Sequence, residues 1–287
     1  MKNYKFSVVI PVYNTQEYLD ECIGSVVNQS YSNWELFLID DGSTDNSYEI
    51  CKKYRKLYGE RVYIQKNKNR GVSYSRNVAL KKIQGDYVIF LDSDDYLMDL
   101  KFFENLNKLI NKTGVDCYIG NFKSFTESSN IEPLIDKEID KKQINKKKHE
   151  KVLEYLYRLR LVFTVWRFIV KADIIRDNNL LMVDGIIHED EEWCVRMLIC
   201  CNTFWKLDEP HYMYRKREQS IMTYNHFKHF DNYLIVCKIL LGYAQQQTEH
   251  YKKIFVQRCA YKCAGQVYYG LKDISEFLPP IKNEKKN

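Results

Sequence analysis

Long apolar runs are missing from this sequence. No apolar stretch approaches the ~18–20 residues that a membrane-spanning helix needs. The first residues, MKNYKFSVVIPVYN, reach a β-rich run and a proline too soon for a signal peptide, and they contain no small-residue cleavage site. The sequence therefore predicts a cytoplasmic protein that is at most peripheral to a membrane.

Paired cysteine motifs are also missing. The nine cysteines are odd in number, contain no C-x-x-C spacing and are scattered from Cys22 to Cys263. Most stand in apolar surroundings, which is typical of buried free thiols. Free thiols indicate a reducing compartment. We therefore expect neither a zinc site nor a disulfide framework.

The net charge of +6 is mild for 287 residues, but it is locally concentrated. One basic cluster is KEIDKKQINKKKHEK, residues 137–151, and another is the terminal KNEKKN. A solvated loop and a frayed terminus would explain both clusters. The alternative is contact with anionic lipid head groups, at about 1 kcal/mol per nearby Lys or Arg.

Strand and helix patterns alternate over the first 121 residues. Apolar, β-branched runs at 6–12, 34–40, 61–66 and 86–92 predict strands, and the segments between them have helical spacing. This alternation predicts an α/β fold with a Rossmann-like, mostly parallel sheet flanked by helices. Thr15 and Ser43 or Thr44 are predicted helix caps. From about residue 223 the pattern predicts a C-terminal helical extension.

Polar clusters follow three of the predicted strands. Asn14, the pair Asp40–Asp41 and the run Asp92–Asp95 each come just after a strand. Ligands of open α/β sheets bind outside the carboxyl ends of the strands. We therefore expect the three clusters to meet at one edge of the sheet.

The run FLDSDDYL, residues 90–97, places Asp92, Asp94 and Asp95 within four positions. Carboxylates this close repel one another unless a cation lies between them. They suit Mg²⁺ or Mn²⁺, and Mg²⁺ usually takes one or two protein carboxylates, with phosphate and water as further ligands. The run therefore indicates a metal that arrives with a phosphorylated substrate. A capped turn before a helix at 97–110 is the alternative.

Two later segments concentrate charge. HEDEEW, residues 188–193, begins a predicted helix with four acids, which the helix dipole favours. One carboxylate among Glu189 and Asp190 can instead be a general base. HYMYRKREQS, residues 211–220, is either a diphosphate clamp containing Arg215 and Arg217 or a basic strand edge.

The order of these segments resembles the family 2 glycosyltransferases, which have the GT-A fold. That family's pattern is strand-P-x-Y-N, strand-D-D-G-S-x-D, N-x-G-x-x-x-a-R-N, strand-D-x-D-D and a later E-D-x-x-F/W. Here it reads VIPVYN (9–14), IDDGSTD (39–45), NRGVSYSRN (69–77), FLDSDD (90–95) and EDEEW (189–193). The first four motifs span residues 5–97. Ser75 replaces the usual Ala before Arg76, and the match thins after about residue 125.

The resemblance implies a site for a nucleotide sugar and Mn²⁺ or Mg²⁺. Asp94 or Asp95 would hold the metal. Asp190 would be the base, with Glu189 as the alternative because the acid run leaves the register uncertain by one residue. The implied donor-binding residues are Pro11, Val12, Tyr13 and Asn14 around the base, Asp41 on the base, Asp92, Ser93 and Asp94 along the ribose and diphosphate, and Arg76, Arg215 and Arg217 at the phosphate charge.

The implied reaction is inverting transfer of a hexosyl or N-acetylhexosaminyl group, with UDP as the commonest donor nucleotide of the family. The acceptor would be a hydroxyl group of a glycan or lipid-linked saccharide at the inner leaflet. Nucleic acid is not an expected partner, and a homodimer is left open. The expected boundaries are a GT-A domain over 1–222, with a donor half at 1–121 and an acceptor half at 122–222, and a helical extension at 223–287.

Two other functions share part of this sequence pattern. An aspartate-based phosphatase also places D-x-D after a strand, but its acidic pair lies downstream, whereas here Asp40–Asp41 lie upstream. The other rival is a non-catalytic partner of a glycosyltransferase complex that binds nucleotide or membrane. The presence of Asp94, Asp95 and Asp190 argues against it.

Overall fold

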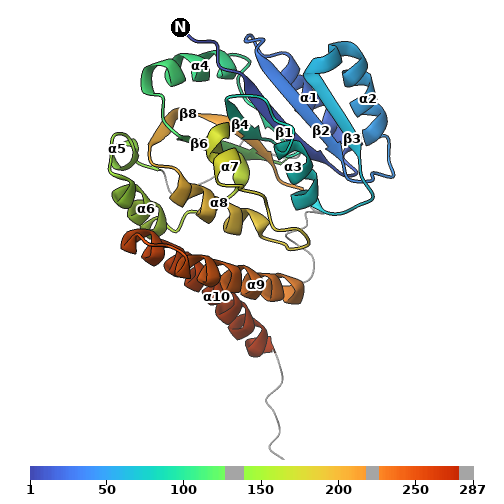
Figure 1. Cartoon of the computed structure of the whole chain (residues 1–287). Helices are drawn as coiled ribbons and strands as arrows, with labels where there is room; N and C mark the ends of the chain where they lie inside the picture. The colour runs from blue at the N-terminus through green and yellow to red at the C-terminus, as the bar shows by residue number, and fades with distance from the viewer. Residues whose placement is uncertain (127–138, 218–225, 278–287) are drawn as a thin grey trace, which may run out of the picture.

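The structure is a computed structural model that describes residues 1–126, 139–217 and 226–277. Its centre is one eight-stranded sheet in the order β3-β2-β1-β4-β7-β6-β8-β5. Helices surround this sheet (Figure 1). The strands are β1 (Phe6–Val12), β2 (Trp34–Asp40), β3 (Val62–Lys66), β4 (Tyr87–Phe90), β5 (Tyr96–Leu97), β6 (Cys117–Phe125), β7 (Phe168–Lys171) and β8 (Phe204–Arg215).

The first half of the sheet confirms the predicted α/β architecture. β1 pairs in parallel with β2 and β4, and β2 pairs in parallel with β3. β1 and β2 are buried along their whole lengths, as expected of strands that are covered on both faces. The helices between these strands are α1 (Gln16–Val27), α2 (Ser47–Tyr58) and α3 (Val72–Leu80). In Figure 1, α3 lies in front of the sheet, and α1 and α2 lie behind it.

The second half of the sheet is mixed. β7 runs antiparallel to both β4 and β6, β8 runs parallel to β6, and β5 runs antiparallel to β8. The parallel order of the first four strands therefore does not extend across the whole sheet. Here the helices are α4 (Phe102–Thr113), α5 (Lys141–Ile144), α6 (His149–Arg158), α7 (Ala172–Asp177) and α8 (Glu189–Cys200), with a short 3-10 turn η2 (Val165–Arg167) before β7. A similar turn, η1 (Gly59–Arg61), precedes β3 in the first half.

The predicted helix caps are confirmed only in part. Thr15 occupies the N-cap position of α1, but its side chain makes no cap hydrogen bond, and its hydroxyl donates to Ser93 Oγ at 3.1 Å. α2 begins at Ser47 rather than near Ser43 or Thr44. The hydroxyl groups of Thr15 and Ser43 instead form hydrogen bonds between loops, to Ser93 and to the N–H of Asn14.

The predicted helix at 97–110 begins later than expected. Residues 96–97 form β5, and the helix runs over 102–113. The N–H of Lys101 donates to the carboxylate of Asp99 at 2.9 Å, so Asp99 closes the turn before this helix. The run Asp92–Asp95 is therefore not the cap of this helix, although it does form a turn, in which the N–H of Asp95 donates to the carbonyl of Asp92 at 3.0 Å.

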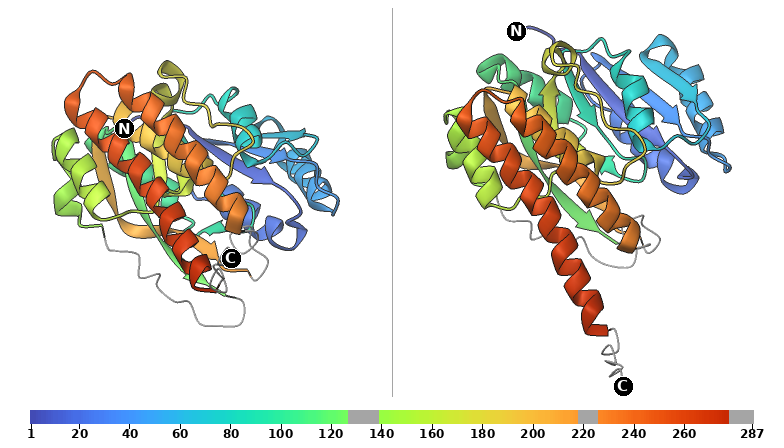
Figure 2. Two further views of the ribbon diagram at one scale, coloured as in Figure 1. Left: turned by 90° about the horizontal axis from the view of Figure 1, so that it is seen from below. Right: turned by 60° about the horizontal axis from the view of Figure 1, so that its bottom comes forward.

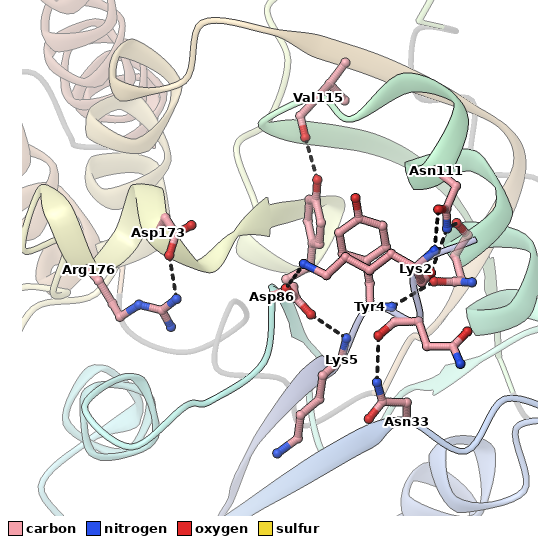
Figure 3. Close-up of polar contacts among 12 residues, drawn as sticks. Lys2, Tyr4, Lys5, Asn33, Asp86, Asn111, Val115, Asp173 and Arg176 are labelled. Carbon is pink, nitrogen blue, oxygen red and sulfur yellow. Dashed lines mark hydrogen bonds and ion pairs between the residues drawn. The ribbon is translucent and has the colours of Figure 1, made fainter.

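The N-terminus is tied to the sheet and to α4 (Figure 3). Asp86, just before β4, accepts the backbone N–H of Lys5 at 2.7 Å and the ammonium of Lys2 at 2.8 Å. Asn111 of α4 accepts the backbone N–H of Lys2 at 2.9 Å, and Tyr87 donates to the carbonyl of Val115 at 2.9 Å. These bonds fix the start of β1 beside β4. The carboxyl end of β1 leads to the candidate site.

Two long helices, α9 (His226–Gln245) and α10 (His250–Phe277), follow the sheet. They lie side by side and pack on α6 and α8, and the far end of α10 extends beyond the rest of the molecule (Figure 2). The predicted boundary at 222/223 and the terminal KNEKKN lie outside the described residues. No helix in the described part of the chain combines the length and apolarity that crossing a bilayer requires.

The cysteines are free thiols, and seven of the nine are buried in the apolar core. Cys200 and Cys237 are half-buried. This confirms the interpretation of the cysteines as core residues.

Candidate active site

The loops after β1, β2 and β4 meet at the carboxyl edge of the sheet, as predicted. The N–H of Asn14 donates to Ser43 Oγ at 3.0 Å, and Asn14 Oδ1 accepts the N–H of Thr44 at 2.8 Å. Thr15 joins the β1 loop to Ser93 of the β4 loop. The motifs are thus hydrogen-bonded to one another rather than merely adjacent.

Asp41 connects the β2 loop to the loop before α3. Its two carboxylate oxygens accept the N–H groups of Arg70 at 2.8 Å and Gly71 at 2.7 Å. Gly42 has φ of 83°, and a Cβ there would lie 3.0 Å from the N of Asn69. Glycine is needed at this point because the two loops pass so closely. Asp41 therefore fixes the β2 loop against the loop before α3, and only its remaining lone pairs can accept further hydrogen bonds.

The residues of VIPVYN have different exposures. Tyr13 is 46% exposed, and Asn14 is exposed with a left-handed φ of 49°. Pro11 and Val12 are buried, and the carbonyl of Val12 accepts the N–H of Asp41 at 2.7 Å. Of these predicted pocket residues, Tyr13 and Asn14 present side chains to solvent, whereas Val12 supports the edge from the core.

Asp95 is held within the protein. It is 1% exposed, and its oxygens accept the hydroxyl of Tyr212 at 2.6 Å and the N–H of Arg215 at 2.7 Å. Burial, together with the charges of Asp94 and Asp92, raises the pKa of Asp95 well above its usual value. Both oxygens hold the end of β8, so this carboxylate is poorly placed for a metal.

Asp94 lies nearer to solvent, with a side chain 19% exposed, and pairs with Arg217 Nη2 at 2.5 Å. Burial raises the pKa of Asp94, Arg217 lowers it, and Asp92 raises it again, with a net upward shift. Within residues 1–126, 139–217 and 226–277, no three acidic, histidine or cysteine side chains form a complete metal site. A single accessible carboxylate still fits a metal that brings phosphate and water ligands.

The two predicted arginines at the end of β8 differ in exposure. Arg215 is 7% exposed, and its guanidinium contacts Glu21 and donates to the carbonyl of Asp94 at 2.9 Å. It also lies over the rings of Tyr18 and Phe125, at 4.7 and 4.6 Å from the centroids. Arg217 is the more exposed of the two arginines at the site.

Arg76 joins the two halves of the site. Its guanidinium, buried on α3, donates to Asp92 Oδ1 and to Glu189 Oε1, each at 2.8 Å. Burial lowers the pKa of Arg76, but the carboxylates of Asp92, Glu189 and Asp190 raise it by more. Arg76 therefore reaches from α3 to the end of β4 and to the start of α8.

The four acids that open α8 have different partners. Glu189 pairs with Arg76, Glu191 with Lys262 of α10 at 3.2 Å, and Glu192 with Arg196 at 2.5 Å. Asp190 Oδ1 accepts the N–H of Glu191, and the described residues provide it with no ion pair. Each of the three glutamates therefore pairs with a cation, whereas the hydrogen bond of Asp190 is to a backbone N–H.

Asp190 is electrostatically suited to accept a proton. Burial raises its pKa well above the usual value, the neighbouring charges of Glu189 and Glu191 raise it further, and Arg76 opposes them. A carboxylate with a raised pKa is a stronger base than an ordinary surface aspartate.

Several residues of the site make contacts that the sequence does not indicate. Tyr212, whose hydroxyl lies 3.2 Å from the N of Asp92, reaches the site from β8 across 120 residues of sequence. Glu21 of α1 and Lys262 of α10 are ordinary helix-surface residues by pattern. Only their distant partners identify them.

A sequence profile described as Glycosyl transferase family 2 matches residues 7–176 of the chain. The chain is 40% identical over 127 residues to Glycosyltransferase GlyA of Streptococcus pneumoniae serotype 4, a match that covers 44% of this chain and 18% of GlyA. It is 29% identical over 229 residues to Glycosyltransferase GlyG of the same organism, covering 75% of this chain and 72% of GlyG. The chain thus spans less than a fifth of GlyA but most of GlyG.

The fold resembles that of S. aureus TarS 1-349, solved in complex with UDP-GlcNAc. The TM-score is 0.71 at 21% sequence identity, and the match covers 96% of this chain and 82% of the TarS chain. This likeness supports the fold that was expected from the order of the motifs.

Proposed function

Because the chain belongs to glycosyl transferase family 2, we propose that it is a metal-dependent, inverting glycosyltransferase that uses a UDP-sugar donor. The acceptor in this proposal is a hydroxyl group of a glycan or lipid-linked saccharide. The observation that carries it is the Arg76 bridge, which joins Asp92 at the donor edge to Glu189, the neighbour of Asp190. One site therefore combines donor-side carboxylates with a base whose pKa is raised.

In the proposed reaction, Asp190 accepts the proton of the acceptor hydroxyl group. The acceptor oxygen attacks the anomeric carbon from the face opposite the diphosphate, while the bond from that carbon to the diphosphate oxygen breaks and UDP leaves with the electron pair. Asp94 would hold Mn²⁺ or Mg²⁺, and this ion would supply positive charge to neutralise the leaving diphosphate. We propose that Arg217, the partner of Asp94, also stabilises the negative charge of the leaving diphosphate.

UDP is favoured as the nucleotide by two observations. TarS, whose fold this chain shares, binds UDP-GlcNAc. The chain also has an exposed aromatic ring, Tyr13, directly after Val12, whose carbonyl accepts the N–H of Asp41, so a stacking surface and a hydrogen-bond acceptor both belong to this strand edge.

The first test separates donor binding from its metal dependence. UDP is titrated with and without Mn²⁺ into wild type, Asp94→Ala and the control Asp208→Ala, which removes an exposed carboxylate of β8. Asp94→Ala should lose the Mn²⁺-dependent affinity by at least about tenfold, while the control keeps it. UDP affinity that does not depend on metal and is unchanged in Asp94→Ala would contradict the metal assignment.

The second test concerns the base. Asp190→Asn should bind UDP as wild type does. Its transfer rate should fall by about 10²–10⁴-fold, because no carboxylate is left to take the proton from the substrate hydroxyl group. Near-normal transfer in Asp190→Asn would move the base elsewhere, with Glu189 as the next candidate. A wild-type protein that binds UDP but turns over no nucleotide sugar would instead favour the non-catalytic partner function.

The proposal places the enzyme at the inner leaflet of a membrane, near a lipid-linked acceptor. It is supported by exposed lysines of the basic segment around α5 and α6, such as Lys146, Lys147 and Lys148. Flotation with anionic vesicles should carry the wild-type protein upward, and a triple Lys→Glu variant at these positions should float less. Equal recovery with neutral vesicles would contradict the electrostatic contact.

A further inference from the structure

The residue that precedes α8 has an uncommon backbone conformation. His188 has φ of 67°, in the left-handed region, and is 7% exposed. Few non-glycine residues adopt this region, and such strain persists where the surroundings enforce it. Because Asp190 lies two residues further along, whatever enforces the turn at His188 also sets the position of Asp190.

α9 makes the enforcing contacts. The His188 ring stacks on Tyr233, with 3.9 Å between centroids and 13° between planes, and its Nε2 lies 3.0 Å from Nδ1 of His229. The N–H of Ile187 donates to Asn232 Oδ1 at 2.8 Å. Burial and His229 lower the pKa of His188 to about 4, so its ring is neutral near pH 7 and can share one proton with His229.

α10 holds the other side of Asp190. The ammonium of Lys262 lies 3.2 and 3.4 Å from the two oxygens of Glu191 and donates to the carbonyl of Leu161 at 3.1 Å. Glu189 is held by Arg76 from the opposite direction. The residues on both sides of Asp190 are therefore anchored outside α8, while the carboxylate of Asp190 accepts a hydrogen bond from the N–H of Glu191 in its own helix.

We propose that His188 is a positioning residue for Asp190, and that α9 and α10 form a brace that sets where this base stands. The brace consists of Asn232, His229, Tyr233 and Lys262. The inference rests on the proposed function. A displacement of about 1 Å can lower a rate by about 100-fold, so loosening the brace should affect turnover. The donor edge is hydrogen-bonded within the β1, β2 and β4 loops, and should keep its affinity for UDP.

The test uses the full chain and matched variants. His188→Gly removes the ring but adopts the same φ without strain. His229→Ala and Lys262→Met remove brace contacts, and Lys262→Arg is the conservative replacement. The controls are Leu234→Ala and Tyr261→Ala, at exposed neighbours of Tyr233 and Lys262. The measurements are kcat and KM for transfer, UDP affinity with Mn²⁺, and amide hydrogen exchange over residues 184–196.

The brace variants should lose about 10- to 100-fold in kcat and keep UDP affinity within about twofold. Amide exchange at 186–191 should rise about tenfold. Lys262→Arg should recover most of the activity, and both controls should match wild type. Unchanged kcat and exchange in folded His188→Gly and His229→Ala would overturn the inference, as would an equal loss of kcat and UDP affinity.

Hydrogen exchange separates this inference from the proposed function. If the wild-type protein transfers no sugar, the proposed function fails, but the brace is still tested by exchange at 186–191. If transfer occurs and exchange at these residues does not respond to any brace variant, the brace fails and the proposed function stands.

Discussion

Replacing Arg76 with Met should be the most damaging single change at the site. It deletes the cation between Asp92 and Glu189 without removing the apolar stem. The two carboxylates are not equally sheltered, because the side chain of Glu189 is 10% exposed and that of Asp92 is 30% exposed. The cost therefore comes mainly from Glu189, which is left buried without a counter-charge.

Breaking a buried pair by removing one partner costs about 3–5 kcal/mol, whereas a partly exposed pair contributes about 0–1 kcal/mol. Because the pair with Glu189 is buried, we expect Arg76→Met to lose about 3–5 kcal/mol of unfolding free energy. The Tm should fall by about 2–4 °C for each kcal/mol lost. Arg76→Lys keeps the charge, but its compact ammonium cannot span both carboxylates, so about 1.5–3 kcal/mol should be lost.

Urea denaturation of wild type, Arg76→Met, Glu189→Gln and the double variant measures the bridge directly. The double variant should lose less than the sum of the two single variants, with a coupling of about 1–3 kcal/mol. Arg158→Met is the control, because Arg158 forms an exposed pair with Glu154. A loss below about 1 kcal/mol for Arg76→Met, together with additive single variants, would refute the bridge as an organising contact.

Two further predictions concern the acids. Burial and the charges of Glu189 and Glu191 raise the pKa of Asp190; Glu189→Gln removes one of these charges, so the pKa of Asp190 should fall. The acid limb of the kcat/KM profile should then move to lower pH, because the base stays ionised further down; a shift to higher pH would contradict this account. Tyr212→Phe should cost about 1–3 kcal/mol by leaving an oxygen of buried Asp95 without its hydroxyl donor. Tyr214→Phe should lose less unfolding free energy. Equal losses in thermal melts of the two variants would contradict the stabilising role of the Tyr212–Asp95 hydrogen bond.

The parallel half of the fold was predictable because its signals are local. Alternating apolar strands and amphipathic helices require βαβ units, and the parallel strands bring their carboxyl ends to one edge. The convergence of Asn14, Asp41 and Asp92 followed from that rule. The antiparallel insertion of β7 between β4 and β6 did not, because short strands with similar apolar patterns do not specify their neighbours.

The sequence also established the chemical character of the site through the order of its motifs. It could not assign individual acids, because Glu189, Asp190, Glu191 and Glu192 are consecutive and chemically similar. Tertiary structure distinguishes them by bringing Arg76 to Glu189 across 113 residues and Lys262 to Glu191 across 71. In the same way, Tyr212 engages Asp95 and leaves Asp94 to Arg217 and the solvent side. A local pattern sets which charges are present, but the distance to a counter-charge sets what each one can do, and that distance exists only once the chain has folded.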